Sequence, residues 1–188
     1  MVAIELCSLT FQHGDCSKSN LIATSIFGDG AAAVLIAGEK NNLKGSKILG
    51  ARSTIWERSL DVMGWTINDN RLKVLFSRDI PSIVYQYMRP NVDSFLDEFN
   101  LSCDKIDHFI AHPGGAKVIR AYEEALNITD GKMRHAWKVL RCYGNMSSPT
   151  VLFVLERFMK DPAVQSLDYG LVSALGPGFS SELLLIQW

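Results

Sequence analysis

The segment over residues 105–126 constrains the fold of this chain more than any other. It changes from charged to apolar up to Ala111, and after residue 116 apolar side chains recur at a helical spacing. Pro113, Gly114 and Gly115 separate the two runs, which predicts a strand, a tight turn and a helix. His112 then lies at a strand end beside a helix N-terminus, whose free N–H groups favour negative charge. Catalytic groups often occupy this position in α/β folds, although a single histidine in a turn is more often solvated or structural.

The remaining sequence contains both strand and helix patterns. The 188 residues suit one domain with a sizeable core. The sequence therefore predicts an α/β fold, with helices packed on a mixed sheet. Strands are predicted at residues 2–6, 31–37, 48–56, 63–67, 72–76, 105–111, 171–175 and 182–187, and helices at 20–27, 80–99, 116–126, 131–143 and 150–159.

Local residues add detail to four of these elements. The strand at residues 2–6 is expected to be buried, and a buried strand without a lead-in favours a truncated chain. The strand at 31–37 is expected inside a sheet because its residues are small and apolar. Pro90 is expected to kink or divide the long helix. Ser148 is predicted to be the N-cap of the last helix, with Pro149 in its first turn.

Composition and charge exclude several classes of function. Net charge is −1, from 19 basic and 20 acidic residues, and the basic residues are scattered, so no nucleic-acid or acidic membrane surface is predicted. No apolar run is long enough to span a membrane, and no secretory signal is recognisable. The four cysteines lack metal-binding spacing, so no metal site is expected. These features favour a cytoplasmic protein with reduced thiols.

Asn145 is the second candidate site residue. It follows Gly144 and precedes an apolar helix, so its side chain can point into the protein, although an asparagine there is more often a cap or turn residue. Two neutral donors that converge on one point are what an enolate or thioester oxyanion requires. His112 and Asn145 together therefore predict an oxyanion site.

Four motifs carry a resemblance to a known family. They occur at residues 26–33 (Ile-Phe-Gly-Asp-Gly-Ala-Ala-Ala), 111–115 (Ala-His-Pro-Gly-Gly), 143–148 (Tyr-Gly-Asn-Met-Ser-Ser) and 176–178 (Gly-Pro-Gly). In this order they resemble type III polyketide synthases, the chalcone and stilbene synthase-like enzymes of the thiolase superfamily. The sequence at residues 5–12 and 76–81 is more similar to bacterial members of the family than to plant members. The resemblance identifies residues 1–188 with the C-terminal domain of such an enzyme, half of a thiolase-like fold.

The resemblance implies a reaction and its participants. Enzymes of this family load an acyl-CoA starter on a cysteine, then decarboxylate malonyl-CoA and condense it onto the acyl group. They use CoA thioesters as substrates, need no further cofactor, and act as homodimers when full length. For a bacterial type, the starter is expected to be a fatty acyl group that gives alkylpyrones or alkylresorcinols.

The resemblance also implies roles for individual residues. His112 pairs with the cysteine thiolate and donates to the thioester oxygen, and Asn145 holds the enolate with it. Phe27 and Phe76 stand where the CoA tunnel meets the cavity, although plain core packing is the alternative for both. The remaining cavity residues implied are Thr10, Cys7, Gly176, Pro177 and Gly178.

The nucleophile is expected to be missing from this chain. The family cysteine opens a buried helix in the N-terminal half, and none of the four cysteines here has that setting. The basic residues that hold the CoA phosphates also lie mostly upstream. The chain alone is therefore expected to be inactive and poorly stable, because half a core leaves apolar faces exposed.

Two alternatives remain open. In the first alternative, the chain is a catalytically inactive half-domain or split-gene remnant. The missing cysteine supports this alternative. In the second it is a condensing enzyme like ketoacyl-ACP synthase III. His-Pro-Gly-Gly in place of His-Gln-Ala-Asn, and Gly-Asn-Met-Ser-Ser in place of Gly-Asn-Thr-Ser, argue against the second.

Overall fold

The computed structural model describes residues 1–188 except 39, 42, 44, 69–70, 78 and 130. The chain contains runs of strands and runs of helices. The strands are β1 (Val2–Glu5), β2 (Gly30–Ala33), β3 (Lys47–Ile55), β4 (Met63–Asn68), β5 (Arg71–Phe76), β6 (His108–Ala111), β7 (Tyr169–Gly176) and β8 (Ser180–Gln187). The α-helices are α1 (Lys18–Ile26), α2 (Ile80–Asp97), α3 (Ala116–Leu126), α4 (Arg134–Tyr143) and α5 (Pro149–Met159), and two short 3₁₀ helices are η1 (Cys7–Thr10) and η2 (Cys103–Lys105).

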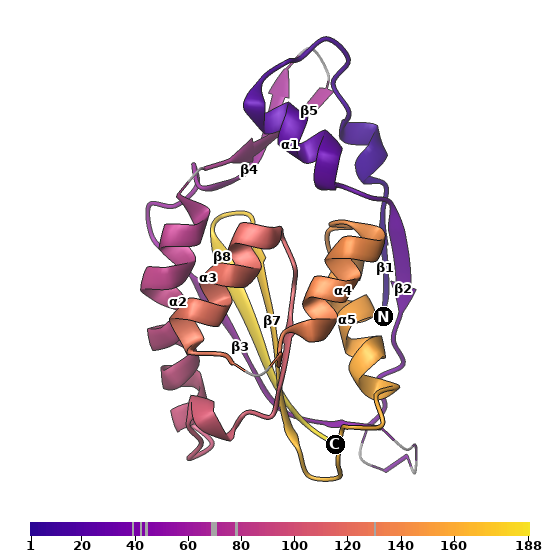
Figure 1. Cartoon of the computed structure of the whole chain (residues 1–188), viewed down its shortest axis with the longest axis vertical. Coiled ribbons are helices and arrows are strands. Elements are labelled where there is room, and N and C mark those ends of the chain that lie inside the picture. Colours follow the sequence, from indigo (N-terminus) through magenta and orange to yellow (C-terminus); the bar gives the residue numbers. More distant parts are fainter. Residues whose placement is uncertain (39, 42, 44, 69–70, 78, 130) are drawn as a thin grey trace.

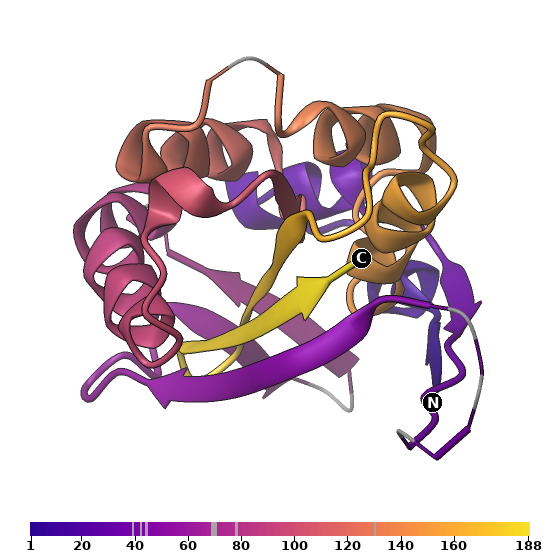
Figure 2. The same cartoon turned by 90° about the horizontal axis from the view of Figure 1, so that it is seen from below.

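A four-stranded mixed sheet forms the centre of the molecule. Its strand order is β3-β8-β7-β6, with β6 parallel to β7 and the other pairs antiparallel. Figure 1 shows α2 and α3 on one flank of the strands and α4 and α5 on the other. Seen from below, the helices arch over the sheet while β3 runs along its outer edge (Figure 2). The predicted α/β fold with a mixed sheet is confirmed.

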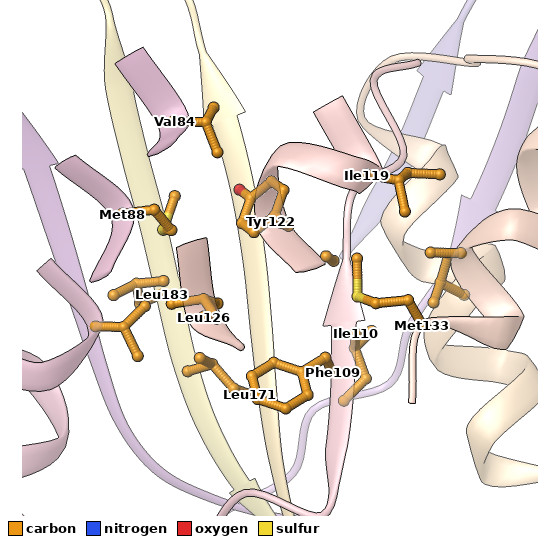
Figure 3. Packing of buried hydrophobic residues seen from close by; sticks show 14 of the residues in the cluster. Val84, Met88, Phe109, Ile110, Ile119, Tyr122, Leu126, Met133, Leu171 and Leu183 are labelled. Carbon is orange, nitrogen blue, oxygen red and sulfur yellow. The ribbon is translucent and has the colours of Figure 1, made fainter. Parts of the chain in front are cut away.

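Much of the core lies where α2 and α3 meet the sheet, and buried residues of α4 and α5 extend it. Apolar side chains from α2, from α3 and from three strands interdigitate in this core (Figure 3). Burial of this kind contributes roughly 25 cal/mol per Å² of apolar surface. The labelled residues are Val84, Met88, Phe109, Ile110, Ile119, Tyr122, Leu126, Met133, Leu171 and Leu183.

Two small two-stranded sheets lie outside the central one. Strands β4 and β5 pair antiparallel, and with α1 they lie beyond one end of the central sheet (Figure 1). Strands β1 and β2 pair antiparallel beside α5. These peripheral elements carry several of the predicted site residues.

The strand–turn–helix prediction holds closely. The strand ends at Ala111 and the helix covers Ala116–Leu126. Two local predictions were partly wrong. Helix α2 is continuous through Pro90, because both Pro90 and Gln86, whose carbonyl loses its helical donor, are exposed and water can replace the bond. Helix α5 begins at Pro149 with Ser148 as its N-cap residue, as predicted, but the Ser148 side chain makes no capping hydrogen bond: the residue has helical dihedrals (φ −56°, ψ −36°) and its hydroxyl donates to Glu5 Oε1 at 2.7 Å.

The expected burial of the first strands was also wrong. Strand β1 forms as predicted, but Val2 and Ile4 are 68% and 65% exposed. Strand β2 pairs with β1 alone and so does not lie inside a larger sheet. An apolar sequence pattern indicates which residues can be buried. Whether they are buried depends on which other parts of the protein pack against them.

The helices give no sign of a membrane span. Within the described ranges, none is both long and apolar enough to cross a bilayer.

Neighbouring positions on α5 provide a test of the packing. Phe158 is fully buried, whereas Met159 is 58% exposed. We expect Phe158→Ala to lower the free energy of unfolding by about 3–5 kcal/mol through the cavity that it leaves. Met159→Ala should change it by less than about 0.5 kcal/mol. Chemical denaturation of both variants measures the difference, and equal effects would contradict the observed helix orientation.

Candidate active site

His112 is fixed one residue beyond the end of β6. Its backbone N–H donates to the Ser173 carbonyl at 2.8 Å, which extends the parallel pairing with β7 past Ala111. The Gly114 N–H then donates to the His112 carbonyl at 3.0 Å and closes the turn into α3. The short parallel strand and the turn together fix the position of the histidine backbone.

His112 is half-buried, and its ring lies beside the turn that follows it. A Cβ added at Gly114 would lie 3.8 Å from its Cδ2 atom, so the ring and this glycine are close neighbours. Burial lowers the pKa of His112 from 6.5 to about 4, because the protein surroundings disfavour the charged form. No described residue hydrogen-bonds to the ring. At neutral pH, His112 therefore offers one N–H donor to a ligand.

Asn145 is held where two loops cross. Its backbone N–H donates to the Ile26 carbonyl at 2.7 Å, and its carbonyl accepts from the Gly28 N–H at 3.0 Å. This approach needs glycine at the crossing, since an added Cβ on Gly144 would lie 2.4 Å from the Ile26 oxygen. Gly144 also has a positive φ of +72°. Gly28 and Gly144, which belong to two different sequence motifs, thus both lie at this backbone crossing.

The Asn145 side chain joins this crossing to the histidine turn. It is only 6% exposed. Its Oδ1 accepts from the Ser147 N–H at 2.8 Å, and its Nδ2 donates to the Gly114 carbonyl at 3.2 Å. The amide nitrogen carries two hydrogens, so one remains for a ligand. The structure therefore brings Asn145 to the turn that carries His112.

The two predicted phenylalanines also meet. The rings of Phe27 and Phe76 pack edge to face with centroids 5.8 Å apart. Phe27 forms an isolated bridge with Asn145, and Phe76 pairs with Met63 across the β4–β5 hairpin. The Gly178 N–H donates to the Met63 carbonyl at 3.2 Å. The Gly176–Pro177–Gly178 turn between β7 and β8 is thus linked to Phe76 through β4.

Cys7 and Thr10 lie in η1, which is attached to the Phe27 loop. The Thr10 hydroxyl donates to the Cys7 carbonyl at 2.8 Å. Ser8 donates to both carboxylate oxygens of Asp29, each at 2.7 Å, from its N–H and its hydroxyl. These bonds lower the Asp29 pKa, with the backbone bond as the larger cause. Asp29 is a positioning residue that the sequence analysis missed, although its place between Gly28 and Gly30 was a usable signal.

The cysteines do not supply a nucleophile at His112 within the described residues. No hydrogen bond joins a cysteine sulfur to its ring there, and all four thiols are free. Burial is the main cause that raises the pKa of Cys7 and of Cys103, which disfavours the reactive thiolate. No group of three or more metal-ligating side chains occurs among the residues that the structure describes.

The geometry suits stabilisation of a negative oxygen. His112 and Asn145 each offer an uncharged N–H, and Gly114 is a neighbour of one and a hydrogen-bond partner of the other. Fixed donors in a partly buried site act on developing charge without reorganisation by water. The site therefore fits chemistry that passes through an enolate or a tetrahedral oxyanion.

Comparison with known proteins points in the same direction. The sequence profile of the family described as chalcone and stilbene synthases, C-terminal domain, matches residues 47–188. A Bacillus subtilis (strain 168) protein with a provisional chalcone synthase name is 48% identical over 100% of this chain and 53% of its own length. The 3,5-dihydroxyphenylacetyl-CoA synthase of Amycolatopsis orientalis is 32% identical over 98% of this chain and 50% of its own length.

A solved structure shows the same fold. The 1,3,6,8-tetrahydroxynaphthalene synthase of Streptomyces coelicolor, a bacterial type III polyketide synthase, superimposes with a TM-score of 0.93 at 26% identity. The superposition covers 100% of this chain and 53% of that one. The chain thus spans about half the length of the relatives that it matches.

Substitution of glycine tests the loop crossing. Gly144→Ala should lower the free energy of unfolding by about 2–5 kcal/mol, because a methyl group cannot fit against the Ile26 carbonyl and φ is positive. Gly131 is a matched control: its φ is +68°, but an added Cβ there meets nothing within 4 Å. Gly131→Ala should cost only about 1 kcal/mol. Thermal or denaturant unfolding measures both, and similar losses would mean that crowding at the crossing is unimportant.

The protonation state of His112 gives a pH test. NMR titration should place its pKa at about 4, with His112→Asn used to assign the signal. Since the unfolded chain takes up this proton near pH 6.5 but the folded chain does not, stability should fall as pH drops from about 6.5 towards 4. The His112→Asn variant should lose this part of the pH dependence. A midpoint at or above 6.5 in the folded chain would contradict the assignment of a neutral donor.

Proposed function

This chain belongs to the chalcone and stilbene synthase family, and we propose that it supplies the C-terminal part of a type III polyketide synthase. The reaction is decarboxylative condensation of malonyl-CoA onto an acyl-CoA starter. The observation that carries this proposal is the link through Gly114, which is a neighbour of the His112 ring and a hydrogen-bond partner of Asn145. The CoA thioester named as product of the Amycolatopsis relative supports the substrate class.

The two donors act on the enolate. Loss of CO₂ from malonyl-CoA breaks a carbon–carbon bond and leaves its electron pair on the α-carbon and the thioester oxygen. The N–H groups of His112 and Asn145 hold this oxygen. The α-carbon then attacks the carbonyl of the enzyme-bound acyl group, and the cysteine thiolate leaves. Phe27 and Phe76 form an aromatic wall that keeps water, and hence protons, away from the carbanion.

The attacking cysteine belongs to a segment outside residues 1–188. None of the four cysteines here hydrogen-bonds to His112 within the described chain. Large apolar side chains near the start of the chain are exposed and offer a surface for that segment to cover. They are Met1, Val2, Ile4, Leu6, Leu9, Phe11, Leu21, Leu35 and Ile36.

The finer parts of the proposal concern products and assembly. The sequence is more similar to bacterial than to plant members of the family. We therefore propose a long-chain acyl-CoA as the first starter substrate to assay, with alkylpyrones or alkylresorcinols as products. The complete enzyme is proposed to be a homodimer in the cytoplasm that needs no cofactor beyond its CoA substrates.

An inactive half-domain is the second candidate. The observation that favours it is that all four thiols are free and none is engaged with His112 among the described residues. Such a chain would keep the oxyanion donors without a nucleophile and would not turn over.

Alanine substitutions in a completed enzyme separate the candidates. The chain is joined to the N-terminal half of a similar synthase, and malonyl-CoA decarboxylation is followed by CO₂ release and mass spectrometry. His112→Ala and Asn145→Ala should each lower the rate by about 100- to 1,000-fold, because each removes one oxyanion donor.

Exposed residues of the same types are the controls. His13→Ala and Asn41→Ala should leave the rate unchanged. Persistent decarboxylation in both site variants would refute the roles of His112 and Asn145. A parent fusion that folds but releases no CO₂ would favour the inactive half-domain.

A further inference from the structure

The hydroxyl of Thr150 closes a hydrogen-bonded ring next to the candidate active site. Thr150 lies in the first turn of α5 and is fully buried. Its Oγ1 accepts from the Met146 N–H at 2.8 Å and donates to the Ser147 carbonyl at 2.8 Å. The Thr150 N–H donates to the same carbonyl at 3.0 Å. Thr150 therefore holds both residues that follow Asn145.

Ser147 needs this support because of its backbone conformation. Its φ is +59°, in the left-handed region that residues other than glycine rarely adopt. In this conformation the Ser147 N–H donates to Asn145 Oδ1 at 2.8 Å. Such a conformation persists only where the surrounding contacts hold it, and here the two hydrogen bonds from Thr150 to the Ser147 carbonyl do so.

Met146 is fixed by a second contact, with β2. It is 2% exposed, and a Cβ added at Gly30 would lie 2.6 Å from its sulfur atom. The Met146 side chain thus fills the space that a side chain at Gly30 would occupy. Residues 146 and 147 are therefore held by β2 as well as by the Thr150 hydroxyl.

These contacts form a continuous path from α5 to the turn that carries His112. Thr150 holds Ser147, and Ser147 donates to Asn145 Oδ1. Asn145 Nδ2 then donates to the Gly114 carbonyl at 3.2 Å. Because the amide group is planar, a hydrogen bond that fixes its oxygen also fixes the direction of its two N–H bonds. The N–H that Asn145 offers to a ligand is thus aimed by way of Thr150.

We propose that Thr150 is a positioning residue for the reaction, whose hydroxyl holds Ser147 in the conformation that orients the Asn145 amide toward the enolate oxygen. The effect on the rate rests on the proposed function, whereas the effect on the amide does not. Thr150 lies outside the four motifs, and its residue type alone indicates only a polar group near a helix N-terminus. An oxyanion donor must be held to within about 0.5 Å to act fully, so a hydroxyl behind it influences the rate.

Two substitutions that differ by a single oxygen atom test the proposal. Thr150→Ser keeps the hydroxyl and Thr150→Ala removes it, while both remove the methyl group. In the intact 188-residue chain, NMR follows the side-chain amide protons of Asn145, which are assigned with Asn145→Ala. Thr150→Ala should speed their exchange with water about tenfold, because Ser147 and the amide lose their support. Thr150→Ser should keep the parental exchange rate within about twofold.

The completed enzyme provides the second measurement. In the fusion with the N-terminal half of a similar synthase, Thr150→Ala should lower kcat for malonyl-CoA decarboxylation about tenfold and leave KM within about twofold. The reason is that an oriented donor acts on the developing enolate more than on the bound substrate. Thr150→Ser should retain the parental kcat.

Val154→Ala is the control for a loss of packing alone. Val154 is fully buried one turn further along α5, and its side chain is apolar. The variant should leave amide exchange and kcat unchanged. If Thr150→Ala does not fold, Thr150→Val replaces it, since valine has the shape of threonine without the hydroxyl.

Several outcomes would overturn the proposal. They are parental amide exchange or parental kcat in the variant without the hydroxyl, equal changes in that variant and in Thr150→Ser, or the same changes in Val154→Ala. The proposed function fails separately: a completed, folded enzyme without decarboxylase activity, in which amide exchange still depends on the Thr150 hydroxyl, would refute the reaction and retain the control of the Asn145 amide by Thr150.

Discussion

The active-site region depends on the close crossing of two loops. The backbones at Ile26–Gly28 and Gly144–Asn145 exchange two hydrogen bonds, and no side chain lies between them. This contact sets Phe27 on one side and the Asn145 amide on the other. Because the first loop also holds η1 through Asp29, one backbone contact positions the Asn145 amide, Phe27 and η1 relative to one another. The remaining packing of the core keeps this crossing in place.

Local sequence patterns predicted most helices and strands well, because the residues within each element largely determine whether it forms. The apolar spacing of α3 and the proline and glycines before it fix that helix from its own residues. The burial of β1 could not be predicted in the same way, since it depends on what covers the strand. Pro90 was misread because tolerance of a helical proline depends on solvent access to the carbonyl one turn earlier.

The site residues were accessible from sequence only through their motifs. His112 and Asn145 are 33 positions apart, and no periodicity relates them. Their connection passes through the Gly114 carbonyl, which is a backbone atom and leaves no mark in the sequence. The same holds for the path from Gly178 to Phe76 through Met63. The sequence thus identifies the participants, whereas their arrangement emerges from long-range backbone pairing.

The orientation of the Asn145 amide sets the polarity of the site. Ser147, held at a positive φ of 59°, aims its N–H at the amide oxygen, while the Gly114 carbonyl faces the amide nitrogen. A half-turn of the amide would place oxygen against oxygen and N–H against N–H. The isosteric aspartate would meet the same conflict at Gly114 as soon as it lost its proton. The protein therefore discriminates between two side chains of nearly identical shape by backbone polarity alone.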